Sequence, residues 1–378
     1  MPVFYITKIC ITAKKYCTIR AMIETLTLTD FRNHALGRIY TGGARNIIIT
    51  GPNGAGKTAV LEAVSMLSGD RGMRGAAMGE IARFGGGGGF CAHATLADDT
   101  DVAVSFGAGD ANRRARIDGD AAPLSALGKI LRIVWLTPRE DRLFVDGAAE
   151  RRAFFDRLAA AFDASHAGRV ARFSKLMTER AGALRVGADM HWMNAIDAQI
   201  SAAATAIAAA RIQYAGELNY FLSDIAVSVD GMVEGLVLQH GAPAAQDLYL
   251  EYLAQNRALV GDKMQIDGPH KSDFGVFNRV LNLPAHLTST GQQKSVLIDL
   301  ILAHARLMHA KTSRRPIILL DEAAAHLDVA ARARVFAALS AANAQVWATG
   351  LDAAVFADVA DAAFVACKDG EINNILTA

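Results

Sequence analysis

One short segment restricts the possible folds of this chain more than any other feature. Residues 51–58 read GPNGAGKT and fit the pattern G-x-x-x-x-G-K-[ST]. An apolar run at 47–50 precedes the segment, and a stretch with the apolar spacing of a helix, 59–67, follows it. A glycine-rich turn between a strand and a helix lets backbone N–H groups face a phosphate, and the helix N-terminus adds a partial positive charge. The segment therefore predicts an α/β domain with a nucleoside triphosphate site.

Two side chains of this segment have specific expected tasks. Lys57 supplies a compact cation for the β- and γ-phosphates, which makes it a candidate catalytic residue, and Thr58 offers a hydroxyl to Mg²⁺. The residues predicted to bind the nucleotide here are Gly51, Pro52, Asn53, Gly54, Ala55, Gly56, Lys57 and Thr58.

A second sequence feature, which ends in two acidic residues, fits the chemistry of a nucleotide site. Residues 317–322 read IILLDE, a hydrophobic strand that ends in two carboxylates. Strand alternation makes the two side chains point differently, so we expect Asp321 to face Mg²⁺ through a water and Glu322 to reach a hydrolytic water. A general base of this kind contributes roughly 10²–10⁴-fold to a rate. Taken alone, the pattern also fits a strand end followed by a helix cap, but after a P-loop we predict that Glu322 is catalytic.

The composition excludes several classes of protein. Hydrophobic residues make up 52% of the chain, which is too many for a disordered tail. The four cysteines are too few and scattered for a disulfide framework or a paired metal site, which favours the reducing cytoplasm. No stretch is long and apolar enough to span a bilayer, so no membrane association is expected. With 39 Lys+Arg against 38 Asp+Glu, the formal net charge is +1, so any nucleic-acid binding must use a local patch.

The order of the predicted elements indicates an α/β domain that is interrupted by an insertion. Residues 138–259 read mostly as alanine-rich amphipathic helices, and strand and helix patterns alternate before and after them. The alternating segments 91–106 and 114–117 predict antiparallel strands at the domain edge, and the five glycines at 85–89 predict a loop. Translation is expected to start at Met22. The predicted divisions are an N-terminal extension at 1–21, the first part of the α/β domain at 22–137, a helical lobe at 138–284 and the second part of the α/β domain at 285–378.

The segment Thr288-Ser289-Thr290-Gly291-Gln292-Gln293-Lys294 precedes a predicted helix, and Ser289 or Thr290 is a natural cap for it. Ser-Thr-Gly-Gln is similar to the signature motif of the ABC-type ATPases, and 325–328 (AHLD) resembles their D-loop. This resemblance implies an ABC-type ATPase head, with a mixed P-loop sheet, an antiparallel β subdomain and an inserted helical lobe. It also implies that two copies close on two ATP molecules and part after hydrolysis. The further ATP-binding residues that it implies are Ser289, Gly291, Gln292 and Asp328.

More local likenesses point to one family within this superfamily. Residues 30–34 (DFRNH), 151–156 (RRAFFD), 268–273 (GPHKSD) and 320–328 (LDEAAAHLD) resemble segments of the RecF family of DNA replication and repair proteins. The likeness runs from about Met22 to the C-terminus. It implies a cytoplasmic ATPase of gap repair and the SOS response that binds ATP and Mg²⁺, with Thr58 and Asp321 at the metal. It further implies binding to single- and double-stranded DNA and their junctions, ATP-dependent dimerisation, slow turnover, and action with RecR and RecO to load a recombinase.

Some positions depart from the superfamily pattern. The usual switch histidine is replaced by Thr349, so a hydroxyl is expected to sense the γ-phosphate, and the Q-loop place, 139–141, holds no glutamine. Two other functions are considered. One is the ATPase subunit of a membrane transporter, which would need a Q-loop glutamine and a switch histidine. The other is a scaffold that binds ATP but hardly hydrolyses it.

DNA binding at near-zero net charge requires local arginines that neutralise phosphates, and it should weaken with salt. Each candidate cluster could equally be a solvated face or an internal ion pair. The candidate arginines are Arg71, Arg74, Arg113, Arg114, Arg116, Arg151, Arg152 and Arg157.

Overall fold

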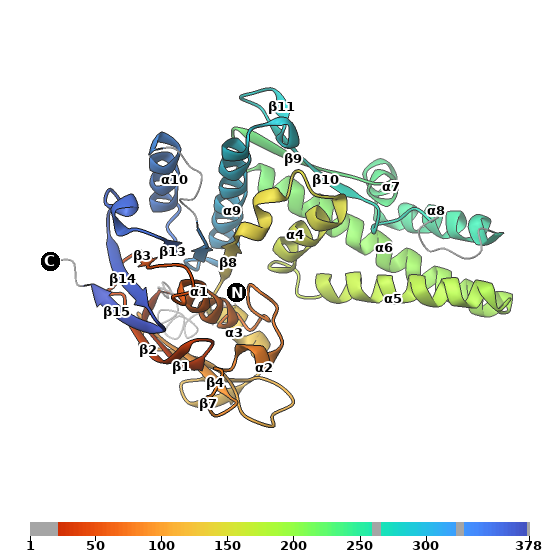
Figure 1. Ribbon diagram of the computed structural model, residues 1–378. Coiled ribbons are helices and arrows are strands. Elements are labelled where there is room, and N and C mark those ends of the chain that lie inside the picture. The colour runs from red at the N-terminus through yellow and green to blue at the C-terminus, as the bar shows by residue number, and fades with distance from the viewer. Residues whose placement is uncertain (1–21, 259–265, 323–328, 376–378) are drawn as a thin grey trace, which may run out of the picture. The chain divides into compact units, whose positions relative to one another are not determined.

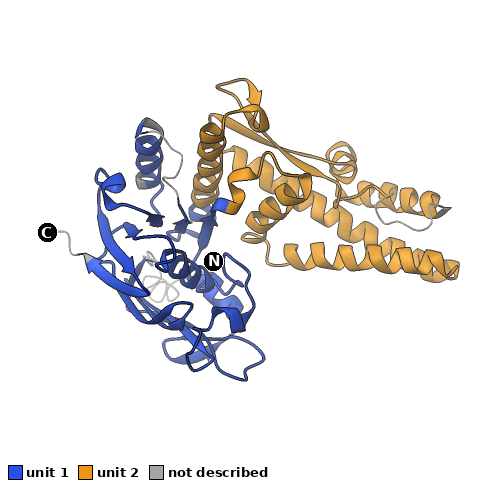
Figure 2. Cartoon of the chain, in the orientation of Figure 1, with its two compact units in different colours: residues 1–138, 308–378 blue, residues 139–307 orange. Residues whose placement is uncertain are grey.

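The computed structural model describes residues 22–258, 266–322 and 329–375, and these form two compact units (Figures 1 and 2). The head unit lies within residues 1–138 and 308–378, and the lobe unit comprises 139–307. The first boundary lies one residue from the predicted one. The second lies beyond the predicted 284, because the first part of helix α9 (Thr290–Thr312) packs within the lobe, where His304 contacts Tyr214.

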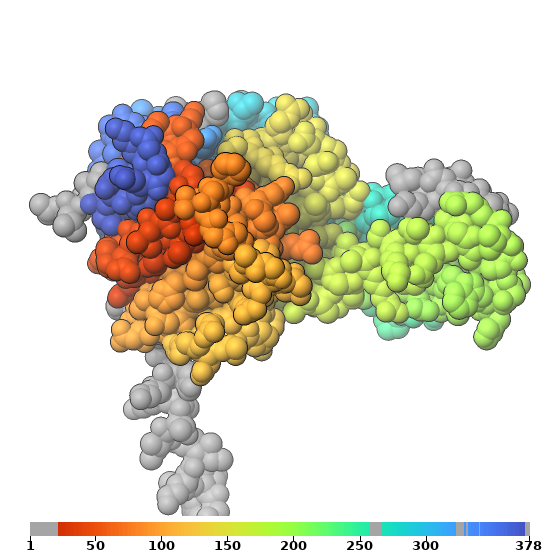
Figure 3. Space-filling model, turned by 60° about the horizontal axis from the view of Figure 1, so that its bottom comes forward, coloured from red at the N-terminus to blue at the C-terminus, as the bar shows by residue number. Residues whose placement is uncertain are grey.

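An antiparallel sheet forms one part of the head unit, in the strand order β2-β1-β4-β5-β6-β7. Alternating residues of its strands are buried, as in β4, where every second side chain faces the core. In Figure 3, red to orange residues from the part of the chain that includes this sheet make up much of the visible surface of the head unit, beside blue residues from near the C-terminus. Its strands are β1 (Ile23–Phe31), β2 (His34–Tyr40), β4 (Phe90–Leu96), β5 (Asp101–Phe106), β6 (Arg114–Ile117) and β7 (Asp120–Ala122).

The second sheet of the head unit carries the P-loop, in the order β15-β14-β3-β13-β12-β8. All its neighbouring strands pair in parallel except β14 and β15, which form a hairpin. Parallel strands of this kind are buried on both faces and read as continuous apolar runs. The strands are β3 (Asn46–Thr50), β8 (Ile133–Leu136), β12 (Ile317–Leu320), β13 (Gln345–Gly350), β14 (Ala362–Lys368) and β15 (Glu371–Ile375).

Helix α1 (Lys57–Met66) is almost completely buried and contacts strands of both sheets, namely β1 and β4 of one and β8 and β13 of the other. Its alanine and valine residues join one hydrophobic cluster with the two sheets, as expected of a helix that is enclosed in a core. The remaining head elements are α2 (Met78–Ile81), α3 (Leu124–Ile130), α10 (Val329–Ala341) and the short 3₁₀ helix η6 (Ala353–Phe356).

The lobe unit contains the predicted helices and, in addition, a three-stranded antiparallel sheet in the order β11-β10-β9. The prediction that 138–259 is mostly helical did not include the strand at 225–230, where the alternating sequence IAVSVD forms β9 and pairs with β10. A six-residue alternation is easily overlooked between long helices. The lobe elements are η2 (Pro138–Arg142), α4 (Ala148–Ala160), α5 (His166–Arg185), α6 (Met190–Asn219), β9 (Ile225–Asp230), α7 (Met232–His240), α8 (Ala242–Gln255), η3 (Asn256–Ala258), β10 (Asp273–Asn278), β11 (Leu283–Pro284), η5 (Ala285–Leu287) and the first part of α9.

Most head elements lie where the sequence predicted them, and the glycines at 85–89 lie outside helices and strands. Strand β15 and the short helices α2 and α3 were not predicted. No helix within the described residues combines the length and the apolar character that crossing a membrane requires. The predicted N-terminal extension, 1–21, lies outside the described residues.

One buried histidine gives the lobe unit an expected pH dependence. His304 is enclosed in the core, its Nδ1 lies 3.1 Å from the Tyr214 hydroxyl, and burial lowers its pKa to about 3. The unfolded chain binds this proton below about pH 6.5 whereas the folded chain does not, so stability should fall with decreasing pH. We expect His304 to account for a loss of about 2 kcal/mol in unfolding free energy between pH 7 and pH 5.

Urea titrations at the two pH values would measure this loss. His304→Gln should reduce it by about the same amount, since the amide does not titrate, whereas the exposed His286→Gln should leave it unchanged. An unaltered pH dependence in His304→Gln would contradict the assignment.

Candidate functional site

The chemistry-bearing residues of the head unit gather at one edge of the parallel sheet. Strands β3, β13 and β12 are consecutive neighbours and run parallel, so their carboxyl ends meet at this edge. The P-loop follows β3, Thr349 lies near the end of β13, and Asp321 follows β12. The sheet therefore places Thr349 on the strand between the P-loop strand and the acidic strand.

The P-loop requires glycine at two positions for both backbone angle and space. Gly51 has φ 148° and Gly56 has φ 103°, which are angles that residues with a side chain rarely adopt. A Cβ at Gly51 would lie 2.1 Å from the carbonyl oxygen of Cys367, and one at Gly56 would lie 2.5 Å from Nε2 of His34. The tight curl brings the backbone N–H groups that open α1 to one side of the loop.

Lys57 is buried beneath this curl, and its position is fixed by the loop itself. Its Nζ donates hydrogen bonds to the carbonyl oxygens of Gly51 at 2.7 Å and Pro52 at 2.9 Å. An ammonium carries three protons, so one remains for a phosphate oxygen. Pro52 and the following Asn53 are exposed, so a triphosphate on this loop would be only partly enclosed by the head unit.

Thr58 and Asp321 come together from distant parts of the sequence. The Thr58 hydroxyl donates to Oδ1 of Asp321 at 3.1 Å, and the Asp321 side chain is nearly buried. A hydroxyl and a carboxylate are hard oxygen ligands, and Mg²⁺ typically takes only one or two protein ligands beside phosphates and waters. The pair therefore fits the magnesium site that the sequence predicts.

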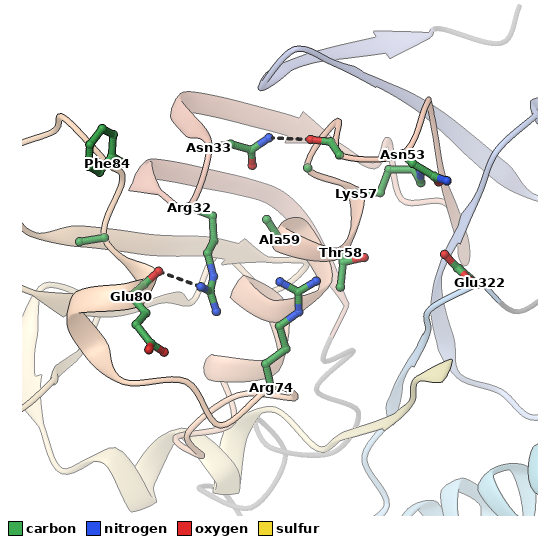
Figure 4. Close-up of a pocket in the computed structure, with 13 residues that line it drawn as sticks. Arg32, Asn33, Asn53, Lys57, Thr58, Ala59, Arg74, Glu80, Phe84 and Glu322 are labelled. Atoms are coloured by element: carbon green, nitrogen blue, oxygen red, sulfur yellow. Dashed lines mark hydrogen bonds between the residues drawn. The ribbon is translucent and has the colours of Figure 1, made fainter. Parts of the chain in front are cut away.

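The side chains of Glu322 and Asp321 differ in exposure, as strand alternation predicts. Asp321 is 8% exposed, whereas Glu322 is exposed and lines the hollow beside the P-loop (Figure 4). Glu322 also has φ 53°, a left-handed backbone conformation that is uncommon outside glycine. Its carboxylate can thus reach a water above the loop while Asp321 stays at its base.

The hollow beside the P-loop has a volume of about 520 Å³ and is lined by residues of the head unit alone. In Figure 4 the side chains of Arg32 and Arg74 extend into the same region beside Thr58, and Phe84 lies at the far side. Phe84 is completely exposed and precedes the glycine-rich loop. The hollow thus offers cations and an aromatic ring next to the phosphate-binding segment.

The DFRNH segment reaches this site because it forms the tight turn between β1 and β2. Asn33 donates to the carbonyl oxygen of Gly54 at 3.4 Å, and His34 Nε2 lies 3.2 Å from that of Gly56 (Figure 4 shows the Asn33 bond). Arg32 forms a bidentate pair with buried Glu62 of α1 at 2.7 and 2.8 Å, which raises the pKa of the guanidinium. The family likeness of this segment was visible in the sequence, but its support of the P-loop was not.

The signature segment lies in the lobe unit, at the start of α9. The Ser289 hydroxyl accepts a hydrogen bond from the backbone N–H of Gln292 at 3.4 Å, and the Gln292 side chain accepts one from the Ser289 N–H at 2.9 Å. This reciprocal pair makes Ser289 the helix cap. Ser289 and Gln292 are exposed and Gly291 is half-buried, so the capped helix end faces solvent within the lobe unit.

Two of the family segments meet inside the lobe. Arg151 forms a bidentate ion pair with Asp273 at 2.8 and 2.9 Å, and Arg152 donates to the Ser272 carbonyl oxygen at 2.6 Å. Asp156 receives two bonds from buried Arg211. These contacts join 151–156 to 268–273, because Arg211 also donates to the carbonyl oxygen of Pro269.

The pKa of Asp156 indicates that the charges of Asp156 and Arg211 serve to hold the lobe together. Burial alone would raise the pKa of Asp156, but hydrogen bonds from His166 and Arg211 outweigh burial and lower that pKa below its ordinary value. Such paired, buried charges hold segments in place and are costly to break.

The candidate DNA-binding arginines therefore divide into two groups. In the lobe unit, Arg151 and Arg152 are engaged as described, and Arg157 pairs with Glu140 at 3.2 Å. In the head unit, Arg71 and Arg74 are exposed and form no ion pair or hydrogen bond with the described residues. The other head arginines have internal partners: Arg113 with the carbonyl oxygens of Gly69 and Asp70, Arg114 with Asp110, and Arg116 with the Gly119 carbonyl oxygen.

The remaining predicted site positions are the D-loop, the Q-loop place and Thr349. The D-loop, including Asp328, lies outside the described residues. The Q-loop place forms η2, where Asp141 pairs with Lys294 of α9 at 3.4 Å within the lobe unit. The predicted γ-phosphate sensor, Thr349, is fully buried, and its hydroxyl donates to Asp321.

Residues 22–373 match the family model described as the RecF/RecN/SMC N terminal domain. The chain is 39% identical over 376 residues to the DNA replication and repair protein RecF of Brucella suis biovar 1 (strain 1330), which covers 94% of this chain and 97% of that protein. It is also 39% identical over 362 residues to the protein of the same name from Mesorhizobium japonicum, with coverage of 89% and 93%.

The fold is similar to those of solved structures. A structure of the recombination mediator protein RecF with ATP, from the RecFOR pathway, matches with a TM-score of 0.75 at 19% sequence identity. The match covers 93% of this chain and 99% of the chain in that structure. The Smc head domain of Pyrococcus furiosus with an extended coiled coil has a TM-score of 0.50 at 14% identity, covering 94% and 96%. The expected ABC-type ATPase fold is confirmed by these matches.

Proposed function

This chain belongs to the RecF/RecN/SMC N-terminal domain family, as a RecF-type DNA replication and repair protein, and we propose that ATP acts in it as a switch for dimerisation and DNA binding. It is an ATPase of the SMC and ABC type. The transporter function considered from the sequence is not favoured. The finer proposal is slow turnover, recognition of gapped or junction DNA, and assistance in loading a recombinase.

The observation that carries this proposal is the convergence of Lys57, Thr58, Asp321 and Glu322 at one edge of the parallel sheet. Thr58 and Asp321 would hold Mg²⁺, which supplies charge neutralisation at the phosphates when bound. Lys57 binds phosphate oxygens, and the Glu322 carboxylate orients a water and takes its proton.

We further propose that a second copy completes the site. The P-loop tip is exposed in the head unit, and the lobe presents an exposed helix cap at Ser289. A helix N-terminus attracts phosphate through its N–H groups and its dipole. The Ser289 end of one copy would therefore cover the γ-phosphate held by the P-loop of the other, and loss of that phosphate would release the copies. RecR and RecO are the partners that the family likeness suggests.

DNA binding is proposed to use exposed arginines of the head unit, with Arg71 as the best candidate, because the lobe arginines are engaged internally. Contacts between arginines and phosphates release counterions, so the affinity should fall linearly with salt on logarithmic scales.

Measuring ATP turnover with and without gapped DNA over a salt series tests the proposal. We expect DNA to stimulate turnover and the stimulation to disappear at high salt. Arg71→Ala should flatten the slope of log affinity against log salt by about 1, whereas the exposed Arg334→Ala should not. Turnover without any DNA effect would refute the DNA switch, and ATP binding without turnover would support the scaffold instead.

A further inference from the structure

Thr349 lies beside the acidic pair but has no role in the ATPase mechanism proposed above. It lies on β13, between the P-loop strand β3 and the acidic strand β12, and its side chain is completely buried. In the parallel register, Leu320 pairs with Ala348, so the next residues along, Asp321 and Thr349, are also neighbours. A buried hydroxyl at this place must find its partners among the residues around the acidic pair.

The Thr349 hydroxyl contacts both members of that pair. Its proton goes to Oδ1 of Asp321, at an oxygen–oxygen distance of 2.7 Å, and its oxygen accepts the backbone N–H of Glu322 at 2.8 Å. The same Asp321 oxygen accepts the Thr58 hydroxyl at 3.1 Å. One threonine thus bridges the carboxylate expected at Mg²⁺ and the backbone of the residue expected to act as general base.

The bond to Glu322 matters because that residue has φ 53°. Left-handed backbone at a residue with a long side chain is unfavourable and persists only where surrounding contacts hold it. The Thr349 hydroxyl supplies such a contact directly at the Glu322 N–H. This backbone turn sends the Glu322 side chain toward the hollow while Asp321 remains at its base.

We propose that Thr349 is a positioning residue for ATP hydrolysis, whose hydroxyl fixes the Asp321 carboxylate and the Glu322 backbone in their working orientations. The inference rests on the proposed ATPase mechanism and deepens it. It also replaces the sequence-based expectation that this hydroxyl senses the γ-phosphate, because its single proton is already donated to Asp321.

Thr349→Val removes the hydroxyl at nearly constant volume and is the main test. We expect kcat to fall about 10- to 100-fold, as for the loss of hydrogen bonds that involve a charged group, while the affinity for ATP changes less than about threefold. Thr349→Ser keeps the hydroxyl and should restore turnover to within about threefold of the unsubstituted chain. The Mg²⁺ concentration for half-maximal turnover should rise in Thr349→Val and return in Thr349→Ser.

Thr41 provides a matched control in the same unit. It is buried, and its hydroxyl donates to the Ile23 carbonyl oxygen at 2.9 Å and accepts the Gly43 N–H at 3.3 Å. Thr41→Val therefore also loses one donated and one accepted hydrogen bond, but with backbone groups only and away from the acidic pair. Its thermal stability should drop about as much as that of Thr349→Val, with unchanged kcat.

A double substitution separates positioning from general damage. In a Glu322→Gln background, Thr349→Val should lower turnover much less than in the original chain, because residues that act as one unit are not additive. Equal turnover of Thr349→Val and Thr41→Val would overturn the inference, as would a serine variant that fails to rescue. If the valine variant does not fold, Thr349→Cys replaces it, since a thiol is only a weak donor, and must show the same loss of kcat. Absence of ATP hydrolysis in the unsubstituted chain would instead refute the proposed function.

Discussion

Replacing Lys57 with alanine is expected to weaken ATP binding about a hundredfold. The Lys57 ammonium is held under the P-loop by the carbonyl oxygens of Gly51 and Pro52, with one proton left for phosphate. Its removal deletes the charge-assisted bond to phosphate and leaves two carbonyl oxygens without their donor. A loss of about 3 kcal/mol corresponds to a Kd about a hundredfold higher.

Titration with a fluorescent ATP analogue would measure this change. Lys129→Ala removes an exposed lysine of the same unit and should leave the Kd unaltered. Thermal unfolding of both variants would verify that the head unit is folded. Tight ATP binding by folded Lys57→Ala would show that the nucleotide lies elsewhere.

Replacing Glu322 with glutamine is expected to lower turnover by about 10²- to 10⁴-fold, the usual contribution of a general base. Glutamine has nearly the same size but cannot take a proton from water. Because Glu322 is exposed at the hollow and is not part of the P-loop, the affinity for ATP should be retained. The variant should therefore hold ATP without consuming it.

Single-turnover and steady-state assays of phosphate release would test this expectation. Glu24→Gln changes an exposed carboxylate on β1 and serves as the control, with unchanged turnover. A Glu322→Gln protein that hydrolyses ATP at the original rate would exclude Glu322 as the base and would point to another group beside the hollow.

The sequence predicted those parts of the site that depend on local chemistry. The P-loop is contiguous, and its glycines, lysine and threonine must lie together wherever the segment folds. The acidic pair was predicted from an apolar strand that ends in carboxylates, and parallel pairing then brings Asp321 next to Thr58.

Features that depend on strand order were not predictable in the same way. Thr349 lies beside Asp321 only because β13 pairs with β12 in one particular register, and nothing in the local sequence specifies that register. The support of Gly56 by His34 likewise depends on where the β1–β2 turn meets the P-loop. In the lobe, the short alternation of β9 was overlooked among long helices, because its pairing partner β10 is distant in sequence.

The internal ion pairs and hydrogen bonds of the lobe arginines could not be predicted for a similar reason. Arg151 and Arg152 look like an exposed basic patch in the sequence, with Asp156 as the one visible counter-charge. Their partners, Asp273 and Ser272, are more than a hundred residues away and meet them only in the folded lobe. Residues 151–156 and 268–273 each resemble a segment of the RecF family. These likenesses therefore indicated a contact between the two segments as much as a function.

Light scattering on Glu322→Gln in saturating ATP and Mg²⁺ tests most directly whether two copies clamp the nucleotide. We expect the molar mass to double from the monomer value of 40.1 kDa, and to remain doubled after free ATP is removed. Adding Ser289→Arg should block the doubling by placing a bulky cation at the start of α9, while ATP binding persists. A Glu322→Gln protein that binds ATP and stays monomeric would contradict the two-copy clamp.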